Sequence, residues 1–106
     1  MGLKIWVDDI RDIPEGYIGF RSVNDALNFI YRNISEIELF DLDHDMGDTF
    51  GGDCINIMNE LERLYYRNSY FNDALPNIKF KFHSANPVGV QNMRAVLQKN
   101  GWTEVR

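Results

Sequence analysis

Residues 36–45 read EIELFDLDHD, and this stretch is the best guide to the fold. Acidic and apolar residues alternate over Glu36–Leu39, and the apolar pattern continues to Leu42 before Asp43, which predicts a β-strand over Glu36–Asp43. His44 and Asp45 follow directly. A strand that stops at reactive side chains is typical of a sheet whose carboxyl edge carries a binding site.

Two further apolar runs repeat this arrangement on either side. Leu3–Val7 (LKIWV) stops at the pair Asp8–Asp9, and Ile78–Phe82 (IKFKF) stops at His83–Ser84. Strands that alternate with helices form a parallel sheet with right-handed crossovers, and the carboxyl ends of such strands share one edge. We therefore expect the side chains after all three runs to meet at a single site.

Three stretches have helical spacing. The first follows Ser22, its expected N-cap, and places apolar residues on one face: Val23, Ala26, Leu27, Ile30 and Tyr31. The second follows Gly51–Gly52 and has a comparable stripe: Ile55, Met58, Leu61, Leu64 and Tyr65. The third begins at Pro87, with Asn86 as its N-cap, and runs to about Asn100.

The remaining segments are predicted to be loops or very short strands. Ile10–Gly19 contains Pro14 and has no helical period, so a loop is expected there. The polar and aromatic segment Asn68–Asn77 is also predicted to be a loop. Phe20–Arg21 is predicted to form a very short strand, and Trp102–Arg106 a short last strand.

One face of the sheet is expected to be thinly covered. In Ile78–Phe82 and Glu36–Leu39 polar residues alternate with apolar ones, whereas a parallel strand covered on both faces is almost entirely apolar. The α/β fold is therefore predicted to be either a three-layer sandwich or a reduced two-layer form. The uncovered face would meet solvent or a second copy of the chain, which makes a homodimer one expected partner.

Composition indicates one small domain and excludes several functions. The 106 residues suffice for a single domain, residues 1–106, and carry a net charge of −5 that disfavours duplex nucleic acid. No segment approaches the roughly 20 apolar residues that span a bilayer, so no membrane contact is expected. The N-terminus turns acidic too early for a signal peptide. Cys54 has no cysteine partner, which favours a reducing, cytoplasmic location.

The carboxylates at the strand ends are candidate metal ligands. Asp8, Asp9 and Asp43 would crowd together, and crowded carboxylates repel one another unless a cation joins them. Mg²⁺, or Mn²⁺ in its place, binds such oxygen ligands together with waters and a substrate phosphate. The alternative is that Asp8 and Asp9 only begin a polar loop.

Asp43, His44 and His83 are the candidate catalytic residues. Asp43 is expected to be a metal ligand, a phosphoryl acceptor or a general base. His83 has the pKa range that suits general acid or base chemistry. His44 would move protons or ligate the metal, although a structural hydrogen bond explains it equally well.

The segment after the third strand is a candidate phosphate-binding site. Ser84, Ala85 and Asn86 lie between a strand and a predicted helix N-terminus, a position where hydroxyl and amide groups contact phosphate oxygens. Arg11 follows the acidic pair and could clamp a phosphate or form a loop salt bridge. Alternatively, these residues do no more than cap the helix.

These motifs resemble the receiver domain of response regulators. There, two acids hold magnesium, a middle Asp accepts a phosphoryl group, and a Ser or Thr contacts the phosphate; these roles would fall on Asp8–Asp9, Asp43 and Ser84. WVDDIRDIP, LDHDMG and HSANPVG together resemble the divergent group of cyclic-phosphate processing receiver domains, over nearly the whole chain. This resemblance implies a receiver or flavodoxin-like fold and the processing of cyclic phosphates.

The sequence also departs from the receiver pattern. No Lys ends the last strand, where Arg106 stands, and the first and last receiver helices are missing. Phe40–Asp43 (FDLD) resembles the DxD nucleophile motif of haloacid-dehalogenase-type phosphatases. That motif ends the first strand of a larger chain, and here it would leave Asp8–Asp9 without a role.

Different functions therefore stay open. The leading prediction is a metal-dependent phosphoesterase with an acidic pocket, which processes a cyclic or terminal phosphate of a nucleotide or RNA end. The two histidines favour hydrolysis. The alternative is a non-enzymatic phosphoacceptor or nucleotide-sensing signalling module, for which the missing Lys is unfavourable. A third is an interaction domain with vestigial acids.

Overall fold

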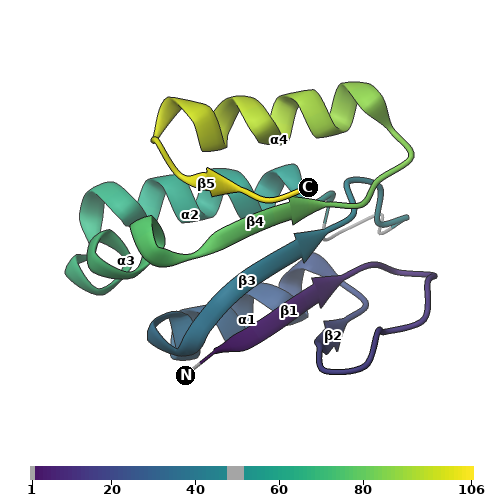
Figure 1. The fold of residues 1–106 in the computed structure, drawn as a ribbon, viewed down its shortest axis with the longest axis horizontal. Coiled ribbons are helices and arrows are strands. Elements are labelled where there is room, and N and C mark those ends of the chain that lie inside the picture. The colour runs from purple at the N-terminus through teal and green to yellow at the C-terminus, as the bar shows by residue number, and fades with distance from the viewer. Residues whose placement is uncertain (1, 48–51) are drawn as a thin grey trace.

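Five parallel strands form one sheet in the order β2-β1-β3-β4-β5 (Figure 1). The structure is a computed structural model that describes residues 2–47 and 52–106. The strands are β1 (Leu3–Val7), β2 (Ile18–Phe20), β3 (Ile37–Leu42), β4 (Lys79–Phe82) and β5 (Thr103–Glu104). The helices are α1 (Val23–Asn33), α2 (Ile55–Arg67), α3 (Ser69–Ala74) and α4 (Pro87–Lys99), with 3₁₀ turns at Ile34–Glu36 and Leu75–Asn77.

Local capping sets the starts of two helices as the sequence predicted. The Ser22 side chain accepts a hydrogen bond from the Asp25 amide at 3.1 Å at the start of α1. The Asn86 side chain accepts one from the Gly89 amide at 3.0 Å, and Pro87 occupies the first turn of α4. Both predicted N-caps are confirmed.

Asn68–Asn77 is not the predicted loop. It contains α3 and a 3₁₀ turn, because the Asn68 side chain accepts hydrogen bonds from the amides of Tyr70 and Phe71 and so caps a helix. Phe71 and Leu75 are buried, and their packing stabilises a segment too short to show a helical period.

Other boundaries also shift by a few residues. The strand expected at Phe20–Arg21 is Ile18–Phe20, because residues 18–20 align with residues 5–7 of β1. Ile10–Gly19 forms no regular element before β2 begins, as expected for most of this loop. Of the Gly51–Gly52 pair, Gly51 lies outside the described residues, and Gly52 has a φ of +74°.

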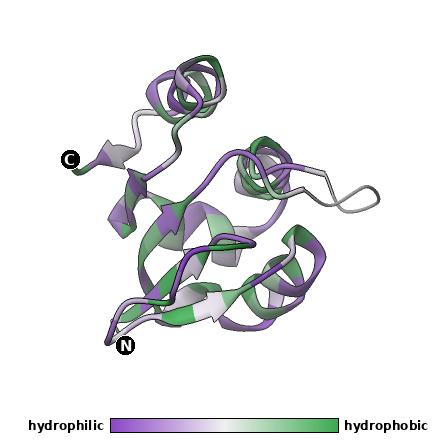
Figure 2. Cartoon of the chain, turned by 90° about the vertical axis from the view of Figure 1, so that its right-hand side faces the viewer, coloured by the Kyte–Doolittle hydropathy of each residue, from purple (hydrophilic) through white to green (hydrophobic). Residues whose placement is uncertain are grey.

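The helices cover one face of the sheet, which gives a two-layer architecture (Figure 2). Alternate strand residues, which point towards the helices, are fully buried: Ile5, Val7, Phe40, Leu42 and Phe80. Among the described residues, no helix lies between β1 and β2 and none follows β5. The reduced two-layer form with one uncovered face is thus the one observed.

Candidate functional site

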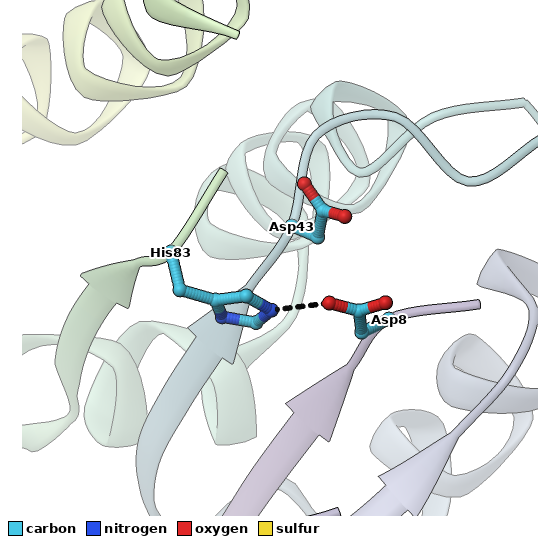
Figure 3. A group of neighbouring side chains, drawn as sticks. All are labelled: Asp8, Asp43 and His83. Carbon is cyan, nitrogen blue, oxygen red and sulfur yellow. Dashed lines mark hydrogen bonds and ion pairs between the residues drawn. The ribbon is translucent and has the colours of Figure 1, made fainter. Parts of the chain in front are cut away.

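Backbone pairing continues one residue beyond three strands and thereby aligns their ends. The Asp43 amide donates to the Val7 carbonyl at 2.9 Å, and the His83 amide donates to the Leu42 carbonyl at 3.1 Å. Asp8, Asp43 and His83 are consequently neighbours across β1, β3 and β4 (Figure 3). The predicted convergence at the carboxyl edge has a direct cause in the register of the sheet.

Asp8 is buried and has several hydrogen-bond donors around it. Its Oδ1 accepts from the amides of Ile10 at 2.8 Å and Arg11 at 3.0 Å, while its Oδ2 faces Arg11 Nη1 and His83 Nε2, both at 2.9 Å. Burial works to raise the pKa of this carboxyl, but the amide and side-chain hydrogen bonds outweigh it and hold the pKa well below its usual range. Asp8 is therefore ionised.

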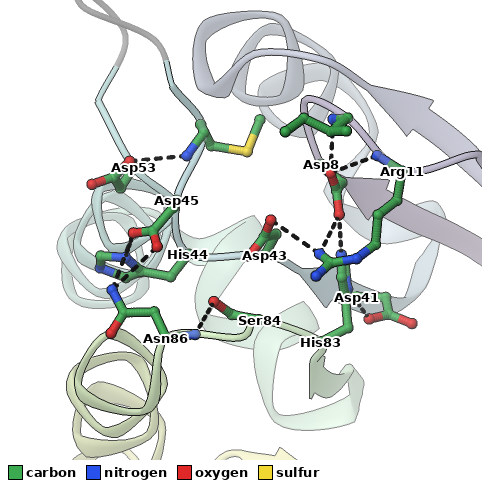
Figure 4. A network of polar contacts seen from close by, with 12 residues as sticks. Asp8, Arg11, Asp41, Asp43, His44, Asp45, Asp53, His83, Ser84 and Asn86 are labelled. Carbon is green, nitrogen blue, oxygen red and sulfur yellow. Dashed lines mark hydrogen bonds and ion pairs between the residues drawn. The ribbon is translucent and has the colours of Figure 1, made fainter.

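The Arg11 guanidinium joins two of the predicted metal ligands. Its Nη1 lies 2.9 Å from Asp8 Oδ2 and 3.2 Å from Asp43 Oδ2 (Figure 4). The hydrogen bond to Asp8 raises the pKa of Arg11 further above its ordinary value, although burial opposes this. A cation between these carboxylates relieves their repulsion, which is the role the sequence assigned to a metal.

His83 is fixed on three sides. Its Nδ1 lies 2.6 Å from Asp41 Oδ1, its Nε2 faces Asp8, and its ring stacks on Trp6 with centroids 3.8 Å apart at an interplanar angle of 4°. The Tyr17 hydroxyl donates to Asp41 Oδ2 at 3.3 Å. The imidazole therefore has a single orientation, set by groups on the uncovered side of the sheet.

Sequence reasoning missed Asp41, Trp6 and Tyr17 as members of this site. Strand alternation could have indicated two of them, because Asp41 lies two residues from Asp43 and Trp6 lies two residues from Asp8. Each pair therefore shares a sheet face. Tyr17 belongs to the loop before β2, and no sequence period predicts its edge-on contact with the Trp6 ring at 5.8 Å.

Asp9 lines the same pocket as Asp8 and Arg11 but has different neighbours. A Cβ added to Gly47, which has a φ of +60°, would lie 2.8 Å from Asp9 Oδ2, so this carboxylate reaches the chain after β3. Its Oδ1 is buried and has no hydrogen-bond partner among residues 2–47 and 52–106. An ionised oxygen without a donor is costly, and a bound cation would satisfy it.

A pocket of about 250 Å³ opens at this edge of the sheet. It is lined by Asp8, Asp9, Ile10, Arg11, Asp43, Asp45, Ser84 and Ala85. The Ser84 hydroxyl accepts a hydrogen bond from the Asn86 amide at 3.0 Å. Four carboxylates in such a small volume repel an anion unless cations are present, and Arg11 is the cation that the lining itself supplies.

His44 and Asn86 belong to a neighbouring cluster and do not line the pocket. His44 Nδ1 lies 2.7 Å from Asp45 Oδ1, and the Asn86 amide group donates to both Asp45 oxygens at 3.1 and 3.3 Å (Figure 4). The hydrogen bond with His44 lowers the pKa of Asp45. The His44 ring lies against the backbone of Gly89 in α4. This second cluster connects the chain after β3 to the start of α4.

Among residues 2–47 and 52–106, two groups of side chains have the proximity needed for a metal. Ligand atoms of Asp8, Asp43 and His83 lie within 4.8 Å of one another, as do those of His44, Asp45 and Asp53. The structure thus brings two of the three predicted ligands, Asp8 and Asp43, together with His83. Oxygen ligands suit Mg²⁺, and an added imidazole suits Mn²⁺ as well.

Comparison with protein families agrees with this architecture. The family model of the cyclic-phosphate processing receiver domain matches residues 3–99. The chain belongs to this family. The match extends from β1 to the end of α4, so every candidate site residue of this cyclic-phosphate processing receiver domain lies inside it. The family resemblance and the receiver-like α/β fold expected from the sequence are confirmed.

The other comparisons add no relative. Neither the search of curated proteins nor that of solved structures found a match to this receiver domain. Within the described part of the chain, the helices are all too short or too polar to cross a bilayer.

Proposed function

We propose that this receiver domain hydrolyses a cyclic or terminal phosphate of a nucleotide or RNA end, with a divalent cation bound at the carboxyl edge of the sheet. The observation that carries the proposal is the position of His83, held by Asp41 through Nδ1 while Nε2 faces Asp8. His83 does not itself line the pocket, but it contacts Asp8, which does. A carboxylate that orients an imidazole beside a polar pocket is a recurrent arrangement for proton transfer.

The pocket carboxylates fit a divalent cation. Asp8, Asp9 and Asp43 would hold Mg²⁺ or Mn²⁺, and the unpartnered Oδ1 of Asp9 supports this assignment. When bound, the cation would polarise the phosphorus–oxygen bonds and neutralise the charge of the carboxylates. Arg11 would then be free to leave Asp8 and Asp43, since its side chain is 46% exposed and reaches the pocket.

The opposite wall of the pocket would bind the phosphate. Ser84 and Ala85 line it immediately before α4, whose N-terminal dipole favours an anion. The Ser84 hydroxyl retains its proton for a phosphate oxygen, because its oxygen is the acceptor in the bond from the Asn86 amide. Arg11 would contact a second phosphate oxygen.

His83 would carry the proton during hydrolysis. In the structure its Nε2 donates to the ionised Asp8, so hydrolysis requires Asp8 to turn to the cation. Nε2 of the tautomer protonated at Nδ1 would then accept the proton of the attacking water as the water oxygen forms its bond to phosphorus. The bond from phosphorus to one ribose oxygen then breaks, and that oxygen receives the proton from His83 Nε2 to become a hydroxyl, which returns the ring to its starting protonation. The ring would keep its Nδ1 proton towards Asp41 throughout.

Hydrolysis of 2′,3′-cyclic AMP with Mg²⁺ or Mn²⁺ tests this proposal. We expect turnover to a nucleoside monophosphate, and a fall of about a hundredfold in His83→Gln with divalent binding retained by calorimetry. Asp43→Asn should lose both divalent binding and turnover while staying folded. Absence of turnover with every divalent metal and every class of small phosphate would contradict the catalytic proposal.

One observation favours the phosphoacceptor alternative. The Asp43 side chain is 11% exposed and lines the pocket that Ser84 also lines, as a phosphorylated side chain would require. Mass spectrometry after treatment with a small phosphodonor distinguishes the two functions. A gain of one phosphoryl group that is absent in Asp43→Asn, combined with no hydrolysis, would support signalling.

A further inference from the structure

The uncovered face of the sheet carries a group of lysines. Lys4 on β1 is in register with Leu39 on β3, which is in register with Lys79 on β4, and Lys81 follows two residues later. We call the surface formed by Lys4, Lys79 and Lys81, together with the intervening Leu39, the lysine face. By strand alternation these side chains project opposite to the buried Phe40 and Phe80, which pack towards the helices.

The lysines of this face form no ion pair within the described chain, although Asp41 is in register with Lys81 on the same side of the sheet. Lys4 and Lys79 are exposed and Lys81 is half-buried, and none of them pairs with a carboxylate of residues 2–47 or 52–106. Lys4 Nζ lies 5.9 Å from the centroid of the Tyr17 ring, a weak contact that leaves its charge in place. A protein of net charge −5 thus presents three adjacent cations on one face.

This charge pattern argues against a homodimer through the same face. A two-fold axis would bring the lysines of one copy against those of the other, and facing like charges are destabilising. The pattern instead complements a polyanion. A second copy of the chain, the partner expected from the sequence, is therefore less favourable on this face than a polyanion.

The lysine face leads directly to the candidate phosphate site. Lys79, Lys81 and His83 are alternate residues along β4 and its continuation, on the same face of the sheet and about 7 Å apart at each step. His83 in turn contacts Asp8 at the rim of the pocket. The half-buried Tyr17 ring lies beside Lys4 and offers an aromatic surface near these cations.

We propose that the lysine face binds the backbone phosphates of a single-stranded oligonucleotide whose terminal phosphate occupies the pocket. The inference rests on the proposed function, because the pocket would bind the end of the strand. Lys81 and Lys79 contact the phosphates that precede the terminal one, and Lys4 contacts a strand that crosses β3. The substrate class is then the end of an RNA strand, and a mononucleotide is only its last unit.

Fluorescence anisotropy with a labelled six-nucleotide RNA carrying a 3′-phosphate tests the inference. In Mg²⁺ we expect Lys4→Gln/Lys79→Gln/Lys81→Gln to bind at least about tenfold more weakly than wild type at low salt. The slope of log K against log salt concentration should change from about −2 towards zero, since each lost contact removes about 0.7. Binding of a nucleoside 3′-monophosphate should be unchanged.

Lys99→Gln is the matched control, because Lys99 lies on α4 and its side chain is 68% exposed. If the triple variant unfolds, the single variant Lys79→Gln replaces it in the test, because Lys79 is exposed and its substitution should leave the fold intact. Equal RNA binding by the triple variant and by Lys99→Gln would overturn the inference. An acidic peptide of equal charge that binds as tightly as the RNA would also overturn it, by indicating a protein partner.

The two proposals fail separately. Lysine-dependent RNA binding without any phosphate hydrolysis would support the assigned strand-binding surface and contradict the catalytic proposal. Hydrolysis of cyclic mononucleotides that is as efficient as hydrolysis of a cyclic-phosphate RNA end, in wild type and triple variant alike, would support catalysis and overturn the strand-binding surface.

Discussion

The imidazole of His83 and the indole of Trp6 lie face to face, 3.8 Å apart between centroids and within 4° of parallel. Trp6 is 8% exposed even though no helix covers its side of the sheet. Aromatic rings cover the end of β1 instead and fix the orientation of the histidine.

Asp41→Asn is expected to reduce phosphate hydrolysis by about tenfold to hundredfold with little change in KM, because it weakens the hydrogen bond that orients His83. The ¹⁵N chemical shifts of the His83 ring should change as well. Tyr17→Phe removes only the 3.3 Å hydrogen bond to Asp41 and should have a smaller effect. Unaltered ring shifts in Asp41→Asn would contradict this positioning role.

Trp6→Ala is expected to lower the free energy of unfolding by about 3 kcal/mol, measured in urea, because it exposes the ring of His83 and the end of β1. Trp6→Phe should cost less than about 1.5 kcal/mol. The indole Nε1 has no hydrogen-bond partner among the residues that the structure describes, so phenylalanine loses no polar contact. Equal costs for the two variants would show that the ring contact contributes nothing.

Arg11→Gln is expected to tighten Mn²⁺ binding by about tenfold in calorimetry, because the guanidinium and the metal compete for Asp8 and Asp43. The metal-free variant should also melt at a lower temperature, since the two carboxylates lose their counter-cation. Arg32→Gln is the control, because Arg32 donates only to the Asn28 carbonyl on α1. Weaker Mn²⁺ binding in Arg11→Gln would indicate that Arg11 assists the metal.

Glu104→Gln is expected to destabilise the domain by about 1–2 kcal/mol at pH 7, and by progressively less as the pH falls through the lowered pKa of Glu104. Two hydrogen bonds of 2.7 Å from Arg94 lower the pKa of Glu104. A lowered pKa adds stability above the unfolded value of about 4.3, and this stability disappears as the pH falls through the folded pKa. Denaturation at several pH values measures it. Arg106→Gln, at an exposed side chain, should change little.

Gly89→Ala is expected to destabilise the domain by about 1–3 kcal/mol, although the same change usually stabilises a helix. The new methyl group would overlap the His44 ring, which lies against this part of α4. Val88→Ala, at a neighbouring exposed position, should stay within about 0.5 kcal/mol of wild type. A stabilised Gly89→Ala variant would show that the His44 ring moves freely.

Much of the fold follows from local features of the chain. Ser22 and Asn86 satisfy helix N-termini with their own side chains, and the apolar runs before Asp8, Asp43 and His83 form the central strands. The segment around α3 could not be predicted in this way. Its six residues are stabilised by the Asn68 cap and by the burial of Phe71. Neither of these produces a helical periodicity in so short a sequence.

The same contrast applies to the site. The sequence predicted that reactive side chains gather at one edge, and Asp8, Asp43 and His83 do lie together. It did not distinguish the pocket wall from the neighbouring cluster around His44, because Asp43 and His44 are consecutive residues after β3. Only the conformation of the chain after β3 places His44 beside Asp45 and Gly89.

The sequence by itself determined where each central strand stops and which reactive group follows it, because hydrophobic runs and caps act over a few residues. The tertiary structure alone decided that Asp41 and Trp6 fix His83, that Arg11 joins Asp8 to Asp43, and that three lysines share one uncovered face. The physical reason is strand register: pairing Val7 with Leu42 and Leu42 with Phe82 places residues from distant parts of the chain within a few ångströms.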